Sequence, residues 1–220
     1  MIFPNNCEIY RMSLQSTFIE LTGKYSSDKN LIQVLWKEVE KKYSSRKRYY
    51  HTLEHLDALL SELHQVKESI NNWDVILFSL FYHDSIYNSL KPDNEEKSAE
   101  LANKGLGELG VDERLITECK ELILATKSHQ RSTNEDFNYF TDADLSVLGQ
   151  DWNVYSNYYK NVRREYSVYP DMIYNPGRIK VLKHFLRMER IYKTGYFYTK
   201  LESQARLNMA KEMEVLEKKQ

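Results

Sequence analysis

The 220-residue chain has only two cysteines, Cys7 and Cys119, together with four prolines and seven glycines. Two cysteines are far too few for a disulfide-stapled secreted scaffold or a cysteine-rich zinc module. We therefore expect both as free thiols in a reducing compartment. Proline and glycine are the residues that interrupt helices most strongly, so their scarcity favours long helices.

Long hydrophobic runs are also missing. The longest run, residues 75–82, is interrupted by Ser79 and is far shorter than the roughly 18 residues that a membrane span needs. The first six residues do not join a basic region to an apolar core, as a secretion signal does. These absences predict a soluble, cytoplasmic protein without a membrane partner.

Charge of one sign is not in excess. The 31 basic and 32 acidic residues give a net charge of −1, so no global field attracts polymeric nucleic acid, and any phosphate binding must be local. The chain is 41% hydrophobic and 29% charged, which is typical of a folded globule. Because no flexible linker divides it, we predict one domain over residues 1–220, with a core at about 28–192.

No stretch alternates apolar and polar residues over four or more positions, so the predicted fold is all-α, a helical bundle. Apolar residues spaced three and four apart, with cap and breaker residues, predict helices from Asp28 to about 43, from Tyr50 to about 63, over 73–87, from Asp93 to Leu109 with a stop at Gly110, from Asp112 to about 126, from Asp142 to 148, around 155–166, around 179–186 and over about 196–218. Residues 127–139 and 170–176 are predicted to be irregular.

Histidines and one aspartate form the most informative pattern. If a helix begins near Tyr50, His51 and His55 lie one turn apart and share a face. His83 and Asp84 follow the most apolar stretch, which delivers them from the interior, where an unpaired charge is costly. Imidazole and carboxylate together suit Mn²⁺, Fe²⁺, Co²⁺, Ni²⁺ or Zn²⁺, and no nearby cysteine closes a structural zinc site. The pattern predicts a divalent-metal site.

Four elements occur in a fixed order: Tyr-His-x-x-x-His at 50–55, Phe-Tyr-His-Asp-Ser-Ile-Tyr at 81–87, Asp-Asn-Glu at 93–95, and Asp-Ala-Asp-Leu at 142–145. Together they resemble the HD superfamily of metal-dependent phosphohydrolases, which is all-helical. Within it, they are similar to a little-characterised bacterial branch of predicted phosphohydrolases. The resemblance covers roughly residues 28–192.

The resemblance implies a hydrolase whose metal ligands are His55, His83, Asp84 and Asp144. The Tyr-His-x-x-x-His element is also similar to one in cyclic-nucleotide phosphodiesterases, which implies that His51 is the general acid. A metal in this setting polarises a phosphoryl oxygen and lowers the pKa of bound water toward neutrality. Asp84 is a catalytic candidate as well, because it can bridge a second ion. The number of ions, one or two, is left open, and Mg²⁺ stays an alternative.

Three further residues are candidates for an extra ligand or a supporting role. His129 is the first choice for an additional ligand or phosphate contact. Asp142 is an alternative to Asp144, or a residue that orients a ligand histidine. Residues 93–96 are first of all typical of a helix start, and a role for Glu95 or Glu96 at the metal is the less favoured alternative.

Arg48 and Arg178 are candidate phosphate contacts, because a guanidinium group can donate two parallel hydrogen bonds to a phosphate. Arg48 also belongs to a charge run typical of a solvated face, and an ion pair explains Arg178 equally well. The predicted substrate is a small phosphorylated molecule such as a nucleotide. Two alternatives are a non-catalytic metal- or nucleotide-binding regulatory module, and a helical interaction protein whose apolar stripe at 201–216 docks a partner or forms a homodimer.

Overall fold

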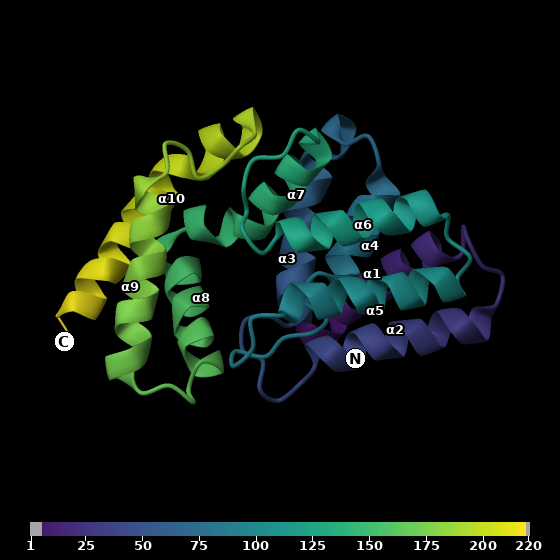
Figure 1. The fold of residues 1–220 in the computed structure, drawn as a ribbon, viewed down its shortest axis with the longest axis horizontal. Coiled ribbons are helices and arrows are strands. Elements are labelled where there is room, and N and C mark those ends of the chain that lie inside the picture. Colours follow the sequence, from purple (N-terminus) through teal and green to yellow (C-terminus); the bar gives the residue numbers. More distant parts are fainter. Residues whose placement is uncertain (1–5, 219–220) are drawn as a thin grey trace, which may run out of the picture.

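The computed structural model describes residues 6–218, with side chains from Leu14 onward, and these residues form ten α-helices, two short 3₁₀ helices and no strand (Figure 1). The all-α prediction is confirmed. Residues 1–5, on which the expectation about a targeting segment rests, lie outside the described residues, as does the side chain of Cys7. Cys119 is a buried free thiol.

Four helices make up the first part of the chain: α1 (Asn6–Thr22), α2 (Lys29–Tyr43), α3 (Leu53–Gln65) and α4 (Trp73–Tyr82), with the 3₁₀ helix η1 (Lys67–Ser69) between the last two. Helix α1 is not among the predicted elements, although Leu14, Phe18 and Leu21 place an apolar stripe in the core. Helix α2 begins as predicted, because the Asp28 carboxylate accepts hydrogen bonds from the backbone N–H groups of residues 30 and 31.

Two predicted boundaries in this region are wrong. Helix α3 begins at Leu53 rather than Tyr50, so His51 lies in the segment before the helix and does not share a helical face with His55. The N–H groups of residues 49–51 donate to Glu165 instead of joining a helix. Helix α4 ends at Tyr82 rather than residue 87, and the turn that follows carries His83 and Asp84.

Helices α5 (Asn94–Glu108) and α6 (Glu113–Ala125) agree with the sequence patterns that define them. Gly110 separates the two helices with a φ of 74°, a left-handed conformation that glycine adopts without the strain of a side chain. Asp112 then caps α6 by accepting the N–H of Arg114. The helix stop at Gly110 and the cap at Asp112 each depend on neighbouring residues only, and both predictions are confirmed.

Helix α7 (Glu135–Asp144) corrects the prediction of an irregular segment over 127–139. Its polar residues suggested a loop, but they make specific hydrogen bonds: Asn134 caps the helix, and Asp136 accepts the N–H groups of Asn71 and Asn72. Asp142 and Asp144 therefore end a helix instead of opening one. The 3₁₀ helix η2 (Leu145–Gly149) follows directly.

The last three helices are α8 (Trp152–Glu165), α9 (Asp171–Arg187) and α10 (Gly195–Glu217). The predicted loop over 170–176 is wrong. Pro170 occupies the N-cap of α9, and the exposed Pro176 lies inside that helix. Proline is well tolerated at helix starts, so Pro170 marks a beginning and not a loop. The terminal helix agrees with the prediction.

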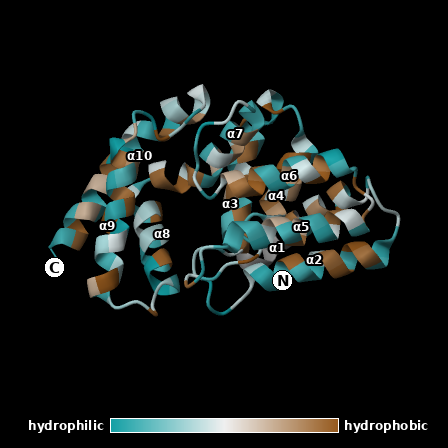
Figure 2. Cartoon of the chain, viewed as in Figure 1, coloured by the Kyte–Doolittle hydropathy of each residue, from teal (hydrophilic) through white to brown (hydrophobic). Residues whose placement is uncertain are grey.

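Helices α8, α9 and α10 lie together at one end of the molecule (Figure 1), and the buried hydrophobic side chains form one cluster to which every α-helix contributes. Hydrophobic residues run as stripes along helices that are otherwise hydrophilic (Figure 2). Residues 75–82 of α4 are all buried, as an apolar central helix requires. None of the described helices combines the length and the hydropathy that a membrane-spanning segment needs.

Candidate metal centre

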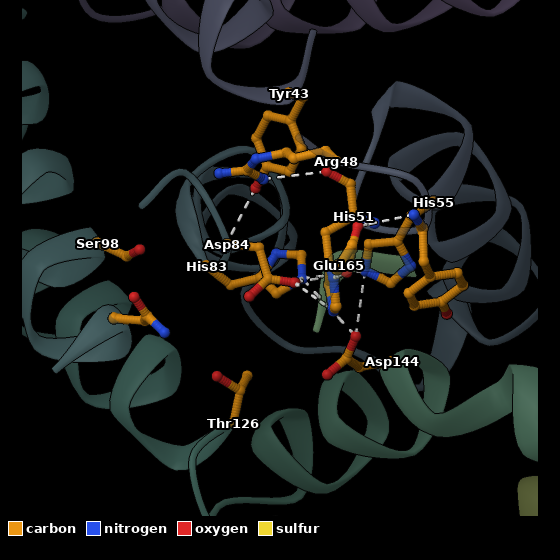
Figure 3. A network of polar contacts seen from close by, with 12 residues as sticks. Tyr43, Arg48, His51, His55, His83, Asp84, Ser98, Thr126, Asp144 and Glu165 are labelled. Atoms are coloured by element: carbon orange, nitrogen blue, oxygen red, sulfur yellow. Dashed lines mark hydrogen bonds and ion pairs between the residues drawn. The ribbon is translucent and has the colours of Figure 1, made fainter. Parts of the chain in front are cut away.

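Three separate elements bring two imidazoles and a carboxylate to one point. His55 comes from the first turn of α3, His83 from the turn after α4, and Asp144 from the last residue of α7 (Figure 3). The Nε2 atoms of the two histidines lie 3.2 Å apart, and Asp144 Oδ1 lies 3.4 Å from that of His55. The three ligand atoms all lie within 4.8 Å of one another. This cluster can hold a metal ion.

Asp84 lies beside the same cluster. Its Oδ2 is 3.2 Å from His83 Nε2 and 3.8 Å from His55 Nε2. Its backbone N–H donates to the hydroxyl of Tyr43, which helps to hold the turn after α4 in place. The structure thus brings together all four residues that the sequence resemblance implies as ligands.

The orientation of His83 follows from the end of α4. A helix leaves its last carbonyl groups without partners inside the helix, and the carbonyl of Leu80 is one of them. His83 Nδ1 lies 3.0 Å from that oxygen, where an Nδ1–H donates to it. This hydrogen bond leaves the lone pair of Nε2 directed at the cluster, as a metal-binding histidine requires.

The electrostatics of the cluster favour a bound cation. Burial alone would lower the pKa of His83, but Asp84 and Asp144 outweigh it and raise that pKa to about 9. Burial would likewise raise the pKa values of both aspartates, yet the neighbouring imidazoles hold each below its usual range. Without metal, a proton on His83 therefore supplies the positive charge that the two carboxylates require.

His51 lies next to this cluster and is oriented by Glu165. The Nδ1 of His51 is 2.7 Å from Glu165 Oε2, and its Nε2 is 3.9 Å from Asp84 Oδ2 (Figure 3). Burial would lower the pKa of His51, but the carboxylates of Asp84 and Glu165 raise it above its ordinary value. A protonated His51 can therefore present an Nε2–H on the side that faces the cluster.

Glu165 contacts the candidate site, although the sequence alone indicated no role for it there. Its side chain is fully buried, and its Oε1 accepts the N–H groups of Tyr49, Tyr50 and His51 at 2.7, 2.8 and 3.1 Å. Burial would raise its pKa, but the hydrogen bonds from His51 and from these amides lower it to about 2. The one clue in the sequence is a carboxylate in the last turn of a helix, where the helix dipole disfavours it.

His129 reaches the cluster as predicted for an extra ligand or a supporting residue. Its Nε2 lies 3.0 Å from Asp144 Oδ2, the oxygen that does not face His55 and His83. His129 also has a φ of 50°, in the left-handed region, which is uncommon for residues other than glycine but which histidine adopts more often than most.

Asp142 is not brought to the cluster, and the two roles considered for it are wrong. Both of its oxygens accept hydrogen bonds from residues 193 and 194, and Lys193 Nζ lies 3.1 Å from Oδ1. Two residues apart on a helix point about 200° away from each other, so Asp142 and Asp144 cannot face one site. Asp142 instead anchors residues 193 and 194, which lead into α10, by hydrogen bonds.

The two candidate phosphate-binding arginines make other contacts. Arg48 is buried, and it donates to the carbonyls of His51 and Ser85, each at 3.0 Å, so it ties together the segments that carry His51 and Asp84. Arg178 forms a two-pronged ion pair with Glu212 at 2.8 and 2.9 Å, which joins α9 to α10. Ion pairing was the alternative for Arg178, and the structure favours it.

A cavity of about 260 Å³ opens beside the cluster. His51, His55, Asp84, His129 and Asp144 all line it, so the candidate acid and three of the four candidate ligands face one space. Glu95 lies on its wall, and Lys127 approaches the Glu95 carboxylate to 4.0 Å. The site can therefore admit a small molecule next to a bound cation.

Compared with family models, curated proteins and solved structures, the chain has no significant match. The function therefore rests on the chemistry of the site. That chemistry consists of two imidazoles and two carboxylates in one cluster, with a further, oriented imidazole beside it.

Proposed function

We propose that the chain is a metal-dependent phosphohydrolase of the HD superfamily that acts on a small phosphorylated substrate such as a nucleotide. The observation that carries this proposal is the convergence of His55, His83 and Asp144 from three separate elements, with Asp84 beside them. These four residues are the ligands that the superfamily resemblance implies. The oriented His51 in the same cavity supports a catalytic over a purely structural role.

The donor set fits a divalent transition metal. His55, His83 and Asp144 would hold the ion, and Asp84 is placed to complete the set or to bridge a second ion. Imidazole with carboxylate suits Mn²⁺, Fe²⁺, Co²⁺, Ni²⁺ and Zn²⁺ better than Mg²⁺, which prefers oxygen ligands. When bound, the ion supplies Lewis acidity toward a phosphoryl oxygen and makes water a stronger nucleophile.

His51 holds the proton that the leaving oxygen needs. Glu165 fixes the Nδ1 side of the ring, and the carboxylates of Asp84 and Glu165 raise the pKa of His51, which favours the protonated ring. The Nε2–H is then available to the cavity. Donation of this proton to the leaving group is general acid catalysis, which contributes typically 10²–10⁴-fold to a rate.

Protein purified without chelator is expected to contain a transition metal at close to one ion per chain or more. Chelation should abolish hydrolysis of p-nitrophenyl esters, and addition of one of the five metals should restore it. Elemental analysis combined with an activity assay checks both points. His184, an exposed histidine of α9, provides the control: His184→Ala should keep metal and activity unchanged. If the purified protein holds no metal and binds none on titration, the proposal of a metal-dependent phosphohydrolase is wrong.

Metal binding is expected to release a proton near pH 7. The pKa of His83 in the metal-free protein is about 9, so the proton must leave before Nε2 can bind an ion. Below pH 9 the apparent metal affinity should therefore rise with pH, by about tenfold per pH unit for one proton displaced. Calorimetric titration in buffers of different ionisation enthalpy measures the proton count. An affinity that is constant between pH 6 and 8 would contradict this expectation.

A further inference from the structure

A second cavity, of about 390 Å³, is lined by residues of α3 and α8 and shares part of its wall with the first. His55 and Asp144 line both cavities, and so do Tyr50 and Tyr158. His51 lines only the first cavity. Two of the candidate ligands, His55 and Asp144, therefore border both cavities, and the candidate acid faces only one of them. Together the volumes fall in the range of roughly 300–1,000 Å³ that is common for small-molecule sites.

The shape of a phosphate ester decides how many cavities it needs. A phosphomonoester carries one organic substituent, so one cavity beside the reacting phosphorus is enough. A phosphodiester carries two substituents, which leave phosphorus in different directions. We propose that the substrate is a phosphodiester whose leaving substituent occupies the cavity that contains His51, while the substituent that stays on phosphorus occupies the cavity between α3 and α8. This inference rests on the proposed function and narrows it to one substrate class.

The reaction balances with water as the only co-reactant. A water oxygen forms a bond to phosphorus, and the bond between phosphorus and the leaving oxygen breaks. The proton on His51 Nε2 passes to that leaving oxygen, and water supplies the proton that restores His51. The products are an alcohol, released from the first cavity, and a phosphomonoester, whose substituent remains in the second.

The charges around the two cavities restrict both substituents. Among the described residues, no lysine or arginine lines either cavity. Asp84 and Glu95 line the first, and Glu54 and Glu62 line the second, where Lys200 pairs with Glu62 at 2.6 Å. A further phosphate or carboxylate on the substrate would face these carboxylates, with no lysine or arginine in the cavity walls to bind it. We therefore expect uncharged substituents, as in a nucleoside or a simple alcohol.

The second cavity also offers neutral polar groups to an uncharged substituent. Gln150, Asn157 and Asn161 line it, and the tyrosine pair Tyr50 and Tyr158, with ring centroids 4.6 Å apart, forms part of the wall that it shares with the first. Amide and hydroxyl groups hydrogen-bond sugars and bases, and aromatic rings contact their apolar faces. Hydrogen-bonding groups on an apolar wall are the usual composition of a site that binds such molecules.

The test compares two probes on metal-loaded protein: p-nitrophenyl phosphate, a monoester, and bis(p-nitrophenyl) phosphate, a diester with the same leaving group. We expect kcat/KM to be at least about tenfold higher for the diester. Ala58 is exposed on α3 and lines only the second cavity, so Ala58→Trp fills that cavity without disturbing the core. This variant should lose at least about tenfold in kcat/KM for the diester and stay within about twofold for the monoester.

Lys104→Trp is the matched control, because Lys104 is exposed on α5 and lines neither cavity. It should leave both kcat/KM values unchanged. A protein that hydrolyses the monoester faster, with Ala58→Trp affecting both probes equally or neither, overturns the diester inference and leaves the proposed function standing. A protein that hydrolyses neither probe with any of the five metals overturns the proposed function, and the diester inference with it. Efficient hydrolysis of ATP would overturn the requirement for uncharged substituents.

Discussion

His55→Ala is expected to leave the protein without tightly bound metal, whereas His51→Ala should keep the metal and lose roughly 10²–10⁴-fold in kcat. The reason is the position of the two rings. His55 Nε2 faces His83 and Asp144 at 3.2 and 3.4 Å, while His51 is held by Glu165 and approaches only Asp84, at 3.9 Å. Elemental analysis and steady-state kinetics on both variants separate the two roles.

The leaving group gives this comparison an internal control. A proton donor matters most when the leaving oxygen is strongly basic, so the deficit of His51→Ala should shrink for a nitrophenyl ester and remain large for an alkyl ester. The two variants remove the same side chain, so a general effect of losing an imidazole would appear in both. Loss of metal from His51→Ala, together with retention by His55→Ala, would reverse the assigned roles.

Local signals predicted the helix boundaries that depend on neighbouring residues. Asp28 caps α2, and Gly110 ends the turn between α5 and α6, because each acts on backbone groups within a few positions. The starts of α3 and α7 were predicted wrongly for a different reason. The amides of 49–51 donate to a residue 114 to 116 positions away, and Asp136 accepts from residues 64 and 65 positions away. Sequence patterns within one segment do not contain such partners.

The site residues also fall into two groups: those that local sequence patterns identify, and those whose role depends on tertiary contacts. His83 and Asp84 are adjacent in sequence, and His55 belongs to a short recognisable element, so their identity could be inferred before their distances were known. The choice between Asp142 and Asp144 depended on which helical face meets the cluster, and that face is set by the contacts of Asp142 with residues 193 and 194. Glu165 was missed because a carboxylate acts here through tertiary hydrogen bonds that leave no local pattern.

Glu165→Gln is expected to keep the fold and the metal while it lowers the rate at neutral pH toward that of His51→Ala, by roughly 10²–10⁴-fold. The glutamine carbonyl can still accept the N–H groups of residues 49–51, which now donate to Glu165 Oε1. Its amide nitrogen, however, presents hydrogens to His51 Nδ1 where Oε2 now accepts one. The doubly protonated ring loses both its hydrogen bond and a negative neighbour, so its pKa falls.

The pH profile distinguishes this positioning role from a general loss of structure. In the native protein the pKa of His51 is raised, so its proton is present below that pKa, and at saturating metal the activity that depends on this proton falls as pH rises through it. In Glu165→Gln the fall should begin at lower pH, and acidification should recover part of the rate. Glu165→Ala is the contrasting variant, because it also leaves three part-buried amides without this acceptor and should destabilise the 49–51 segment. A rate that drops equally at every pH in Glu165→Gln would mean that Glu165 only supports the 49–51 segment and does not set the proton of His51.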